Sequence, residues 1–399
     1  MKKILILTSI TIITMALMLF IPNEVSAAPG ANAQLDVIDA NDNVFHFCNG
    51  GIITGVEIPG TSSTNPSASY DETSNTLTLN NFNGRSIIAT DMGDDFEIKV
   101  IGNNTTTIIE TDDAVKFIGD GSLTVDVDEW ETSQLFMGTE LGIFATNKVE
   151  INGPTIKMTL NNTGVPAQGI ISEGAIKIDS GKIEIQGNFG MGINCYNFGQ
   201  ININGGNLTI SALDCAISSQ EKVEINGGNL KLKSENMGIY AGNRIILNGG
   251  ITEIEAGNMA VLVENIYEDI SLTLSDKMKI DEGVKVTKGT HDFYGHTSHF
   301  ATFSKGTVTF DPQTYEFINA TKNITIKDSN VTTGNGQGNQ GSTSQDLTIQ
   351  GAGQAIAQKP AEKDDTPKTG NESILYMNNK VVIITIVLTL ITLAAVIKK

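Results

Sequence analysis

Three histidines within nine residues come closest, by type and spacing, to a transition-metal site. His291, His296 and His299 carry imidazole nitrogens, which bind zinc and copper. Their spacings of five and three residues fit neither one face of a helix nor one face of a strand. The segment is typical of a hairpin in a C-terminal cap, and we predict no metal ligands in it.

Clustered carboxylates offer a second kind of chemistry. Asp91, Asp94 and Asp95 lie within five residues of one another, and Asp112 and Asp113 are adjacent. Carboxylate oxygens are the ligands that calcium prefers. Calcium is therefore a candidate ligand at these residues. Because such clusters more often form solvated turns, we predict that the protein requires no cofactor.

Cleavage of a polysaccharide would need a more specific set of residues. A lyase needs a calcium cluster with a basic proton acceptor, and a hydrolase needs two close carboxylates. Arginine occurs only at Arg85 and Arg244, and no Asp-Asp or Asp-His pair recurs in neighbouring repeats. We therefore predict no catalytic residues and a protein that is not an enzyme. A β-helix lyase or hydrolase is the alternative, and a structural adhesin that contacts protein is another.

A sequence repeat must position these residues. Its clearest copies begin at Gln200, Lys222 and Arg244, 22 residues apart, and each contains Asn-Gly-Gly. Looser copies begin at residues 148 and 175, and earlier ones near residues 76, 96 and 114. Repeats of this period form solenoids, and we count about eight coils.

Within each copy the apolar residues alternate, as in Val223 and Ile225, then Leu230 and Leu232. Alternation with period two predicts short strands, and Asn-Gly-Gly supplies the positive φ for a corner. Three short strands in 22 residues predict one coil of a parallel β-helix. The fold class is therefore all-β.

Alignment of the third strands gives a column of five isoleucines and one valine, which we expect to stack in the core. The preceding column holds only glycine and alanine, and strict alternation predicts that it faces outward as a shallow trough. Phe144, Asn194 and Tyr240 stand beside this column, and Trp130 lies in an acidic loop that interrupts a coil. Aromatic rings beside a trough suit a glycan, so these four residues are the predicted glycan contacts.

The chain has only three cysteines, too few for a disulfide framework. Cys195 and Cys215 are four positions apart in this alignment, beyond the reach of a disulfide. We expect both to be buried core thiols.

Both ends of the chain carry targeting patterns. Lys2 and Lys3 precede an apolar stretch and Val25-Ser26-Ala27, which predicts a secretory signal peptide cleaved between Ala27 and Ala28. At the other end, residues 381–397 form an apolar run followed by Lys398 and Lys399, which predicts a transmembrane helix in the precursor.

A five-residue motif precedes that apolar run: Thr366, Pro367, Lys368, Thr369 and Gly370. In this order, motif, helix and basic tail resemble the sorting signal of Gram-positive surface proteins, whose pattern is Leu-Pro-x-Thr-Gly. The resemblance implies that a sortase cuts between Thr369 and Gly370 and joins the chain to peptidoglycan. Thr366 departs from the usual Leu, which implies a sortase that accepts a different first residue. A secreted protein anchored in a Gram-positive cell wall is the expected localisation.

Charge and composition complete the organisation. The net charge of −19 disfavours nucleic acid as a partner, because phosphate backbones are repelled. Residues 331–365 are rich in Gly, Gln and Thr and predict a disordered linker that spans the wall. The expected domains are a signal peptide (1–27), an N-terminal cap (28–75), the β-helix (76–267), a C-terminal β cap (268–330), the linker and the sorting signal (366–399).

The repeat also resembles a family of extracellular carbohydrate-binding right-handed β-helices from Gram-positive bacteria. The resemblance rests on the Asn-Gly-Gly-Asn-Leu-Thr-Ile corner, on the turn at Asn236-Met-Gly-Ile-Tyr and on residues 70–79, which look like the family's entry strand. It covers about residues 35–330. It implies a polysaccharide or glycan as the partner. Some members hold calcium in Asp-Asp-Gly-Ile turns, and the matching turn at residue 214 reads Asp-Cys-Ala-Ile.

Overall fold

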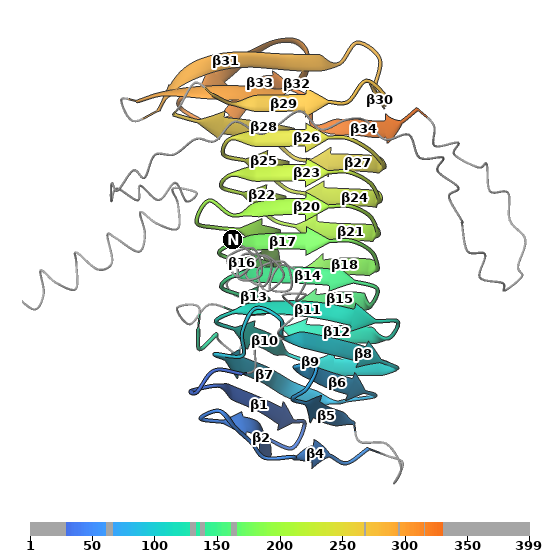
Figure 1. The fold of residues 1–399 in the computed structure, drawn as a ribbon. Helices are drawn as coiled ribbons and strands as arrows, with labels where there is room; N and C mark the ends of the chain where they lie inside the picture. Colours follow the sequence, from blue (N-terminus) through green and yellow to red (C-terminus); the bar gives the residue numbers. More distant parts are fainter. Residues whose placement is uncertain are drawn as a thin grey trace, which may run out of the picture. The chain divides into compact units, whose positions relative to one another are not determined.

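The structure is a computed structural model that describes residues 29–60, 67–127, 133–135, 140–160, 166–266, 269–293, 296–314 and 316–329. These residues form 34 strands and no helix. Most of the strands stack in parallel into a β-solenoid of about eight coils, which confirms the all-β solenoid predicted from the repeat (Figure 1).

Three sheets run along the solenoid, and each full coil contributes one strand to each. The parallel strands of the first sheet are β7 (Gly84–Thr90), β10 (Ile108–Thr111), β13 (Leu141–Ala145), β16 (Ala167–Ser172), β19 (Phe189–Cys195), β22 (Cys215–Ser219), β25 (Met237–Ala241) and β28 (Met259–Asn265).

The second sheet faces the viewer in Figure 1. Its parallel strands are β6 (Thr76–Asn80), β8 (Glu97–Ile101), β11 (Ala114–Gly119), β14 (Lys148–Asn152), β17 (Ala175–Ile178), β20 (Gln200–Ile203), β23 (Lys222–Ile225), β26 (Arg244–Leu247) and β29 (Ser271–Leu274).

The third sheet closes the coil. Its parallel strands are β9 (Asn103–Thr106), β12 (Ser122–Val127), β15 (Thr155–Leu160), β18 (Lys182–Gly187), β21 (Asn207–Ala212), β24 (Asn229–Ser234) and β27 (Ile251–Ala256).

Antiparallel strands pair with the first and last coils, where a solenoid would otherwise leave unpaired strand edges. Those at the N-terminal end are β1 (Gln34–Asp39), β2 (Val44–Asn49), β3 (Ile52–Ile53), β4 (Glu57–Ile58) and β5 (Ala68–Asp71). Those at the C-terminal end are β30 (Met278–Ile280), β31 (Lys285–Phe293), β32 (His296–Asp311), β33 (Glu316–Ala320) and β34 (Asn323–Asp328).

The isoleucine column predicted from the repeat is confirmed. Ile143, Ile170, Ile193, Ile217, Ile239 and Val261 are partners in successive strand pairs, and all are fully buried. Two earlier coils extend the column with Ile87 and Ile109. Because like residues stack at the strand spacing of about 4.8 Å, each coil completes the core of its neighbours.

The Asn-Gly-Gly corners join the second sheet to the third. The second glycine of each adopts positive φ: 89° at Gly206, 93° at Gly228 and 80° at Gly250. A side chain at these positions would be strained, so the repeated glycine has a backbone reason.

Candidate functional site

The column of small residues in the first sheet faces the core, which corrects the predicted trough. A Cβ added to Gly192 would lie 2.3 Å from Ile210 Cγ2, and one added to Gly238 would lie 2.2 Å from Ile254 Cγ2. Both isoleucines belong to the core and come from the third sheet. Ala216, in the same column, is also part of the core.

The outward prediction is wrong because strict alternation stops at this column. The strand pairing skips these residues, as between Met191 and Ile193, and the small residue and the isoleucine that follows both face the interior. Cys215 lies just before the position at which alternation stops, and its register partners are Met191 and Met237. It is not part of the main core cluster, whereas Cys195 is. Both thiols are buried and free.

The column after the isoleucines lies on the other side of the first sheet from the core. It brings three predicted glycan contacts, Phe144, Asn194 and Tyr240, into one line of partners through Ile171 and Ser218. Phe144 is only 1% exposed and Asn194 only 3%. These two side chains are therefore buried and do not form an exposed wall.

Separate apolar clusters cover the two ends of this column. Phe144 packs with Ile108, Leu141 and Ile171, against which Leu135 and Tyr196 also pack. Tyr240 packs against residues of the C-terminal antiparallel strands, among them Phe300 and Phe317, and burial raises the pKa of its hydroxyl. The remaining predicted site residues lie outside the described residues: Trp130, Ala27, Ala28, Thr366, Pro367, Lys368, Thr369 and Gly370.

A largely exposed aromatic residue, Phe198, was not among the predicted site residues. Phe198 is 76% exposed and lies in the corner between β19 and β20, where the first and second sheets meet. Most corners along this edge have two residues between strands, for example Glu173 and Gly174, whereas this corner has four. The signal in the sequence is the spacing of 25 residues between Ala175 and Gln200, where the next copies are 22 apart.

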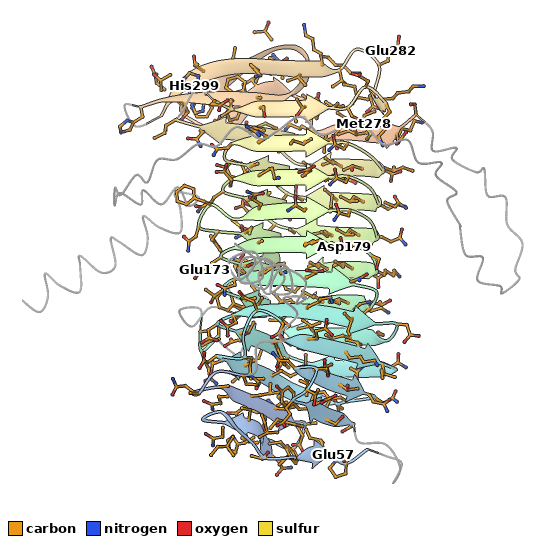
Figure 2. All side chains as sticks on the ribbon, viewed as in Figure 1. Glu57, Glu173, Asp179, Met278, Glu282 and His299 are labelled. Carbon is orange, nitrogen blue, oxygen red and sulfur yellow. The ribbon has the colours of Figure 1, made fainter. Side chains whose placement is uncertain are left out.

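The same edge of the solenoid carries acidic and amide side chains that bond from coil to coil. Asn197 Nδ2 donates to Glu173 Oε2 at 3.1 Å, and Asn243 Nδ2 donates to Glu221 Oε2 at 2.5 Å. Glu173 lies on this edge at the left of Figure 2. The edge is therefore polar and negatively charged beside the exposed ring.

The candidate calcium residues lie farther along this edge, and their oxygens accept hydrogen bonds. Asp112 Oδ1 accepts from the backbone N–H of Asp91 at 2.9 Å, and Asp113 Oδ2 accepts from that of Gly93 at 2.8 Å. Asp94 Oδ1 accepts from an asparagine of the second following coil at 2.8 Å. Burial raises the pKa of Asp112. Within the described part of the chain, no three acidic, histidine or cysteine side chains are grouped so that they could hold a metal.

The histidine segment forms the predicted hairpin, made by β31 and β32. His291 is buried, with Nε2 2.6 Å from Glu264 Oε1 and its ring stacked on Phe310 at 3.9 Å between centroids. His296 is exposed and pairs in register with Phe293, at the end of the hairpin. The three imidazoles therefore do not share one environment.

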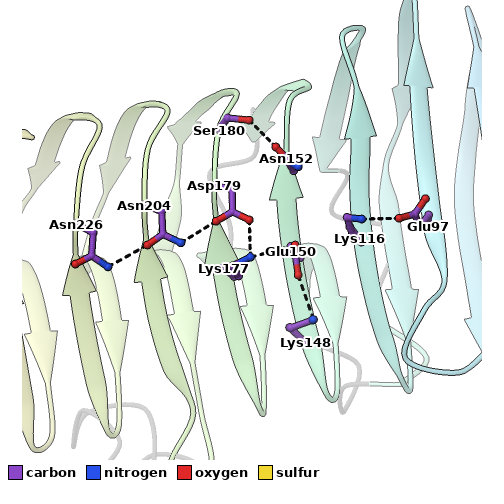
Figure 3. Close-up of polar contacts among 10 residues, drawn as sticks. All are labelled: Glu97, Lys116, Lys148, Glu150, Asn152, Lys177, Asp179, Ser180, Asn204 and Asn226. Atoms are coloured by element: carbon purple, nitrogen blue, oxygen red, sulfur yellow. Dashed lines mark hydrogen bonds and ion pairs between the residues drawn. The ribbon is translucent and has the colours of Figure 1, made fainter. Parts of the chain in front are cut away.

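A ladder of polar side chains crosses the outer face of the second sheet (Figure 3). Asn226 Nδ2 donates to Asn204 Oδ1 at 3.0 Å, and Asn204 Nδ2 donates to Asp179 Oδ1 at 2.7 Å. Lys177 Nζ lies 2.5 Å from Asp179 Oδ2 and 3.3 Å from Glu150 Oε1. Partial burial alone would raise the pKa of Asp179, but the hydrogen bonds from Lys177 and Asn204 hold it below its usual value.

Fold and surface together define a parallel β-solenoid with a polar outer face on its second sheet and an exposed aromatic residue at one corner. A family model described as "Carbohydrate-binding domain-containing protein" matches residues 67–341, which is 275 of the 399 residues. The chain therefore belongs to this family of carbohydrate-binding domain-containing proteins. The match includes every parallel strand and the Phe198 corner. No curated protein and no solved structure matches the chain.

Among the residues that the structure describes, no helix has the length and apolar character needed to cross a membrane.

Proposed function

We propose that this protein is secreted, is anchored to the cell wall, and binds a polysaccharide or host glycan through its β-solenoid without cleaving it. The observation that carries the proposal is the family match, which spans the whole stack of coils. A solenoid suits an extended polymer because it repeats similar polar groups at each coil, about every 4.8 Å.

The non-catalytic part of the proposal rests on how the acidic side chains are used. The carboxylates of Asp112, Asp113 and Asp179 accept hydrogen bonds from groups in neighbouring coils. Of the two arginines, Arg85 forms an ion pair with Asp42 at 2.6 Å. Acid–base catalysis needs carboxylates or bases that reach the scissile bond, and these groups serve the fold.

The anchoring part rests on the two targeting patterns of the sequence. The signal peptide directs secretion, a sortase processes the motif at residues 366–370, and peptidoglycan receives the new C-terminus at Thr369. The composition of residues 331–365 predicts a spacer between the β-solenoid and this attachment point.

The test uses a fragment of residues 28–330, whose strands share one continuous core. The fragment is mixed with insoluble plant, wall and host polysaccharides, with and without calcium, and the supernatant is assayed for released sugar. Retention without release is the expected result. Release of unsaturated or reducing ends would replace the proposal with a lyase or hydrolase, and no retention on any polymer would remove the carbohydrate claim. Dependence of retention on calcium would assign that ion a role.

A further inference from the structure

The corner between β19 and β20 is a tight turn with an unfavourable residue at its tip. Gly199 N–H donates to Tyr196 C=O at 2.7 Å, and the two central residues have positive φ, 47° at Asn197 and 65° at Phe198. Two central residues with positive φ define a type I′ turn, which favours Asn followed by Gly. Asn197 fits this rule, whereas Phe198 occupies the position where glycine is preferred. A bulky residue in the left-handed region is strained, and such strain concentrates at functional sites.

The residues on both sides of Phe198 pack closely against the solenoid, while its own side chain extends into solvent. Tyr196, at its base, packs against the cluster around Phe144, and burial raises the pKa of its hydroxyl to about 12. At the other side, a Cβ on Gly199 would lie 2.3 Å from Cys195 Sγ and 2.5 Å from Gly174 O, so the chain packs closely there. Phe198 lies between Tyr196 and Gly199, and its side chain is 76% exposed. This is a larger exposed fraction than that of any other large hydrophobic residue that the structure describes.

Carboxylates of the neighbouring coils stand on both sides of this turn along the same edge. Glu173 belongs to the preceding coil and is bonded to Asn197 of the turn itself. Glu221 belongs to the following coil, because β20 pairs with β23 and Gln200 is the partner of Lys222. The turn that carries the exposed ring is therefore flanked, along this edge, by acceptors from both adjacent coils.

This combination fits one class of ligand. A pyranose ring lays its C–H face on an aromatic ring, and its hydroxyls donate to carboxylates at its rim. An amino group on the sugar would add a charge-assisted bond to the same carboxylates. Uronic acid residues would be repelled by these carboxylates and by the net charge of −19.

We propose that the Asn197–Phe198 turn is a stacking subsite for an uncharged or amino-substituted pyranose residue of a polysaccharide. The proposal rests on the proposed function and names the class of sugar and the residue that receives it. Phe198 supplies the stacking face. Glu173 and Glu221 each use Oε2 to accept from Asn197 and Asn243, and the second oxygen of each carboxylate supplies an acceptor for the substituents.

The test compares Phe198→Gly and Phe198→Trp with the unchanged 28–330 fragment. Ile52→Ala is the matched control, because Ile52 is 70% exposed and lies in β3 at the N-terminal end. Retention is measured on an insoluble neutral glucan, on chitosan and on polygalacturonate, and thermal unfolding is measured for each variant. Phe198→Gly should bind at least tenfold more weakly and yet melt at a higher temperature, because glycine relieves the backbone strain. Phe198→Trp should keep binding, and Ile52→Ala should leave it unchanged.

Opposite changes in binding and stability separate a ligand subsite from a merely structural turn. Equal retention of Phe198→Gly and the unchanged fragment would overturn the subsite while leaving the proposed function in place. Preference for polygalacturonate over both other polymers would overturn the assigned class of sugar. Failure of the unchanged fragment to bind any polymer would overturn both proposals.

Discussion

Replacing Gly192 with alanine tests directly whether the small-residue column faces the core. The new Cβ would lie 2.3 Å from Ile210 Cγ2 and 2.7 Å from the carbonyl oxygen of Ala216. Non-bonded carbon atoms prefer separations of about 3.5–4.0 Å, so the two strands must move apart or the Ile210 side chain must leave its position.

The cost follows from this overlap. Overpacking a well-filled core by a methyl group costs about 1–3 kcal/mol. Replacing a glycine also removes freedom from the unfolded chain, which offsets about 0.4–1 kcal/mol of that cost. We expect a net loss of about 1–2 kcal/mol, or roughly 1.5–3 °C in melting temperature at about 2.1 cal/mol/K of unfolding entropy per residue for a fragment of this size.

Gly190→Ala is the matched control on the same strand. The nearest atom to its new Cβ would be Pro166 Cβ at 3.3 Å, and the next lie at 3.7 Å, so a change within about 0.5 kcal/mol is expected. Both variants and the unchanged fragment are compared by thermal unfolding and by the midpoint of denaturant unfolding. Combining Gly192→Ala with Ile210→Ala should cost less than the sum of the two single changes, because they share one contact. Equal midpoints for Gly192→Ala and Gly190→Ala would refute the inward orientation and restore an outward trough.

Three further predictions concern the polar ladder, the thiols and the anchor. Asp179→Asn should destabilise the fragment more at pH 7 than at pH 3, as measured by denaturant titrations. The pKa of Asp179 is lower in the folded state than its unfolded value of 3.8. The stabilisation by the ionised carboxylate is therefore present above pH 3.8 and is lost as the pH falls through the folded pKa. In the folded protein, Cys195 should not react with a disulfide reagent between pH 7 and 9, and it should react after unfolding, because burial raises the pKa of its thiol to about 12. Reaction of Cys195 in the folded protein at the rate of a solvent-exposed thiol would contradict this burial. Thr369→Ala should leave the full-length protein in the membrane fraction of its host, and covalent attachment of this variant to purified wall would exclude Thr369 as the sorting residue.

The fold could be predicted from the sequence because each coil of a solenoid repeats the same sequence pattern. The 22-residue spacing, the Asn-Gly-Gly corners and the isoleucine column each occur in several coils, so each position is tested several times by the same pattern. Neighbouring coils contact each other in a fixed register, and that register follows from aligning the copies. The hairpin around His291 could also be predicted, because a hairpin joins two strands that are adjacent in the sequence.

The site could not be predicted as well, because the exposure of a side chain depends on which residues pack against it from other parts of the chain. Alternation alone places the small residues outward, and only the isoleucines of the third sheet, such as Ile210, show that the strand bends there to bring them inward. Phe144 does face away from the main core, but Leu135 and Tyr196, from other parts of the chain, pack against the cluster that buries it.

The sequence by itself determined the class of fold, the number of coils and the residues that stack in the core, because these follow from a repeated local pattern. The tertiary structure decided which side chains solvent reaches. Phe198 is the clearest case: two additional residues in one corner mark it in the sequence, but its exposure results from a left-handed turn anchored between Tyr196 and Gly199. Surface accessibility is a property of packing between distant segments, and no local pattern carries it.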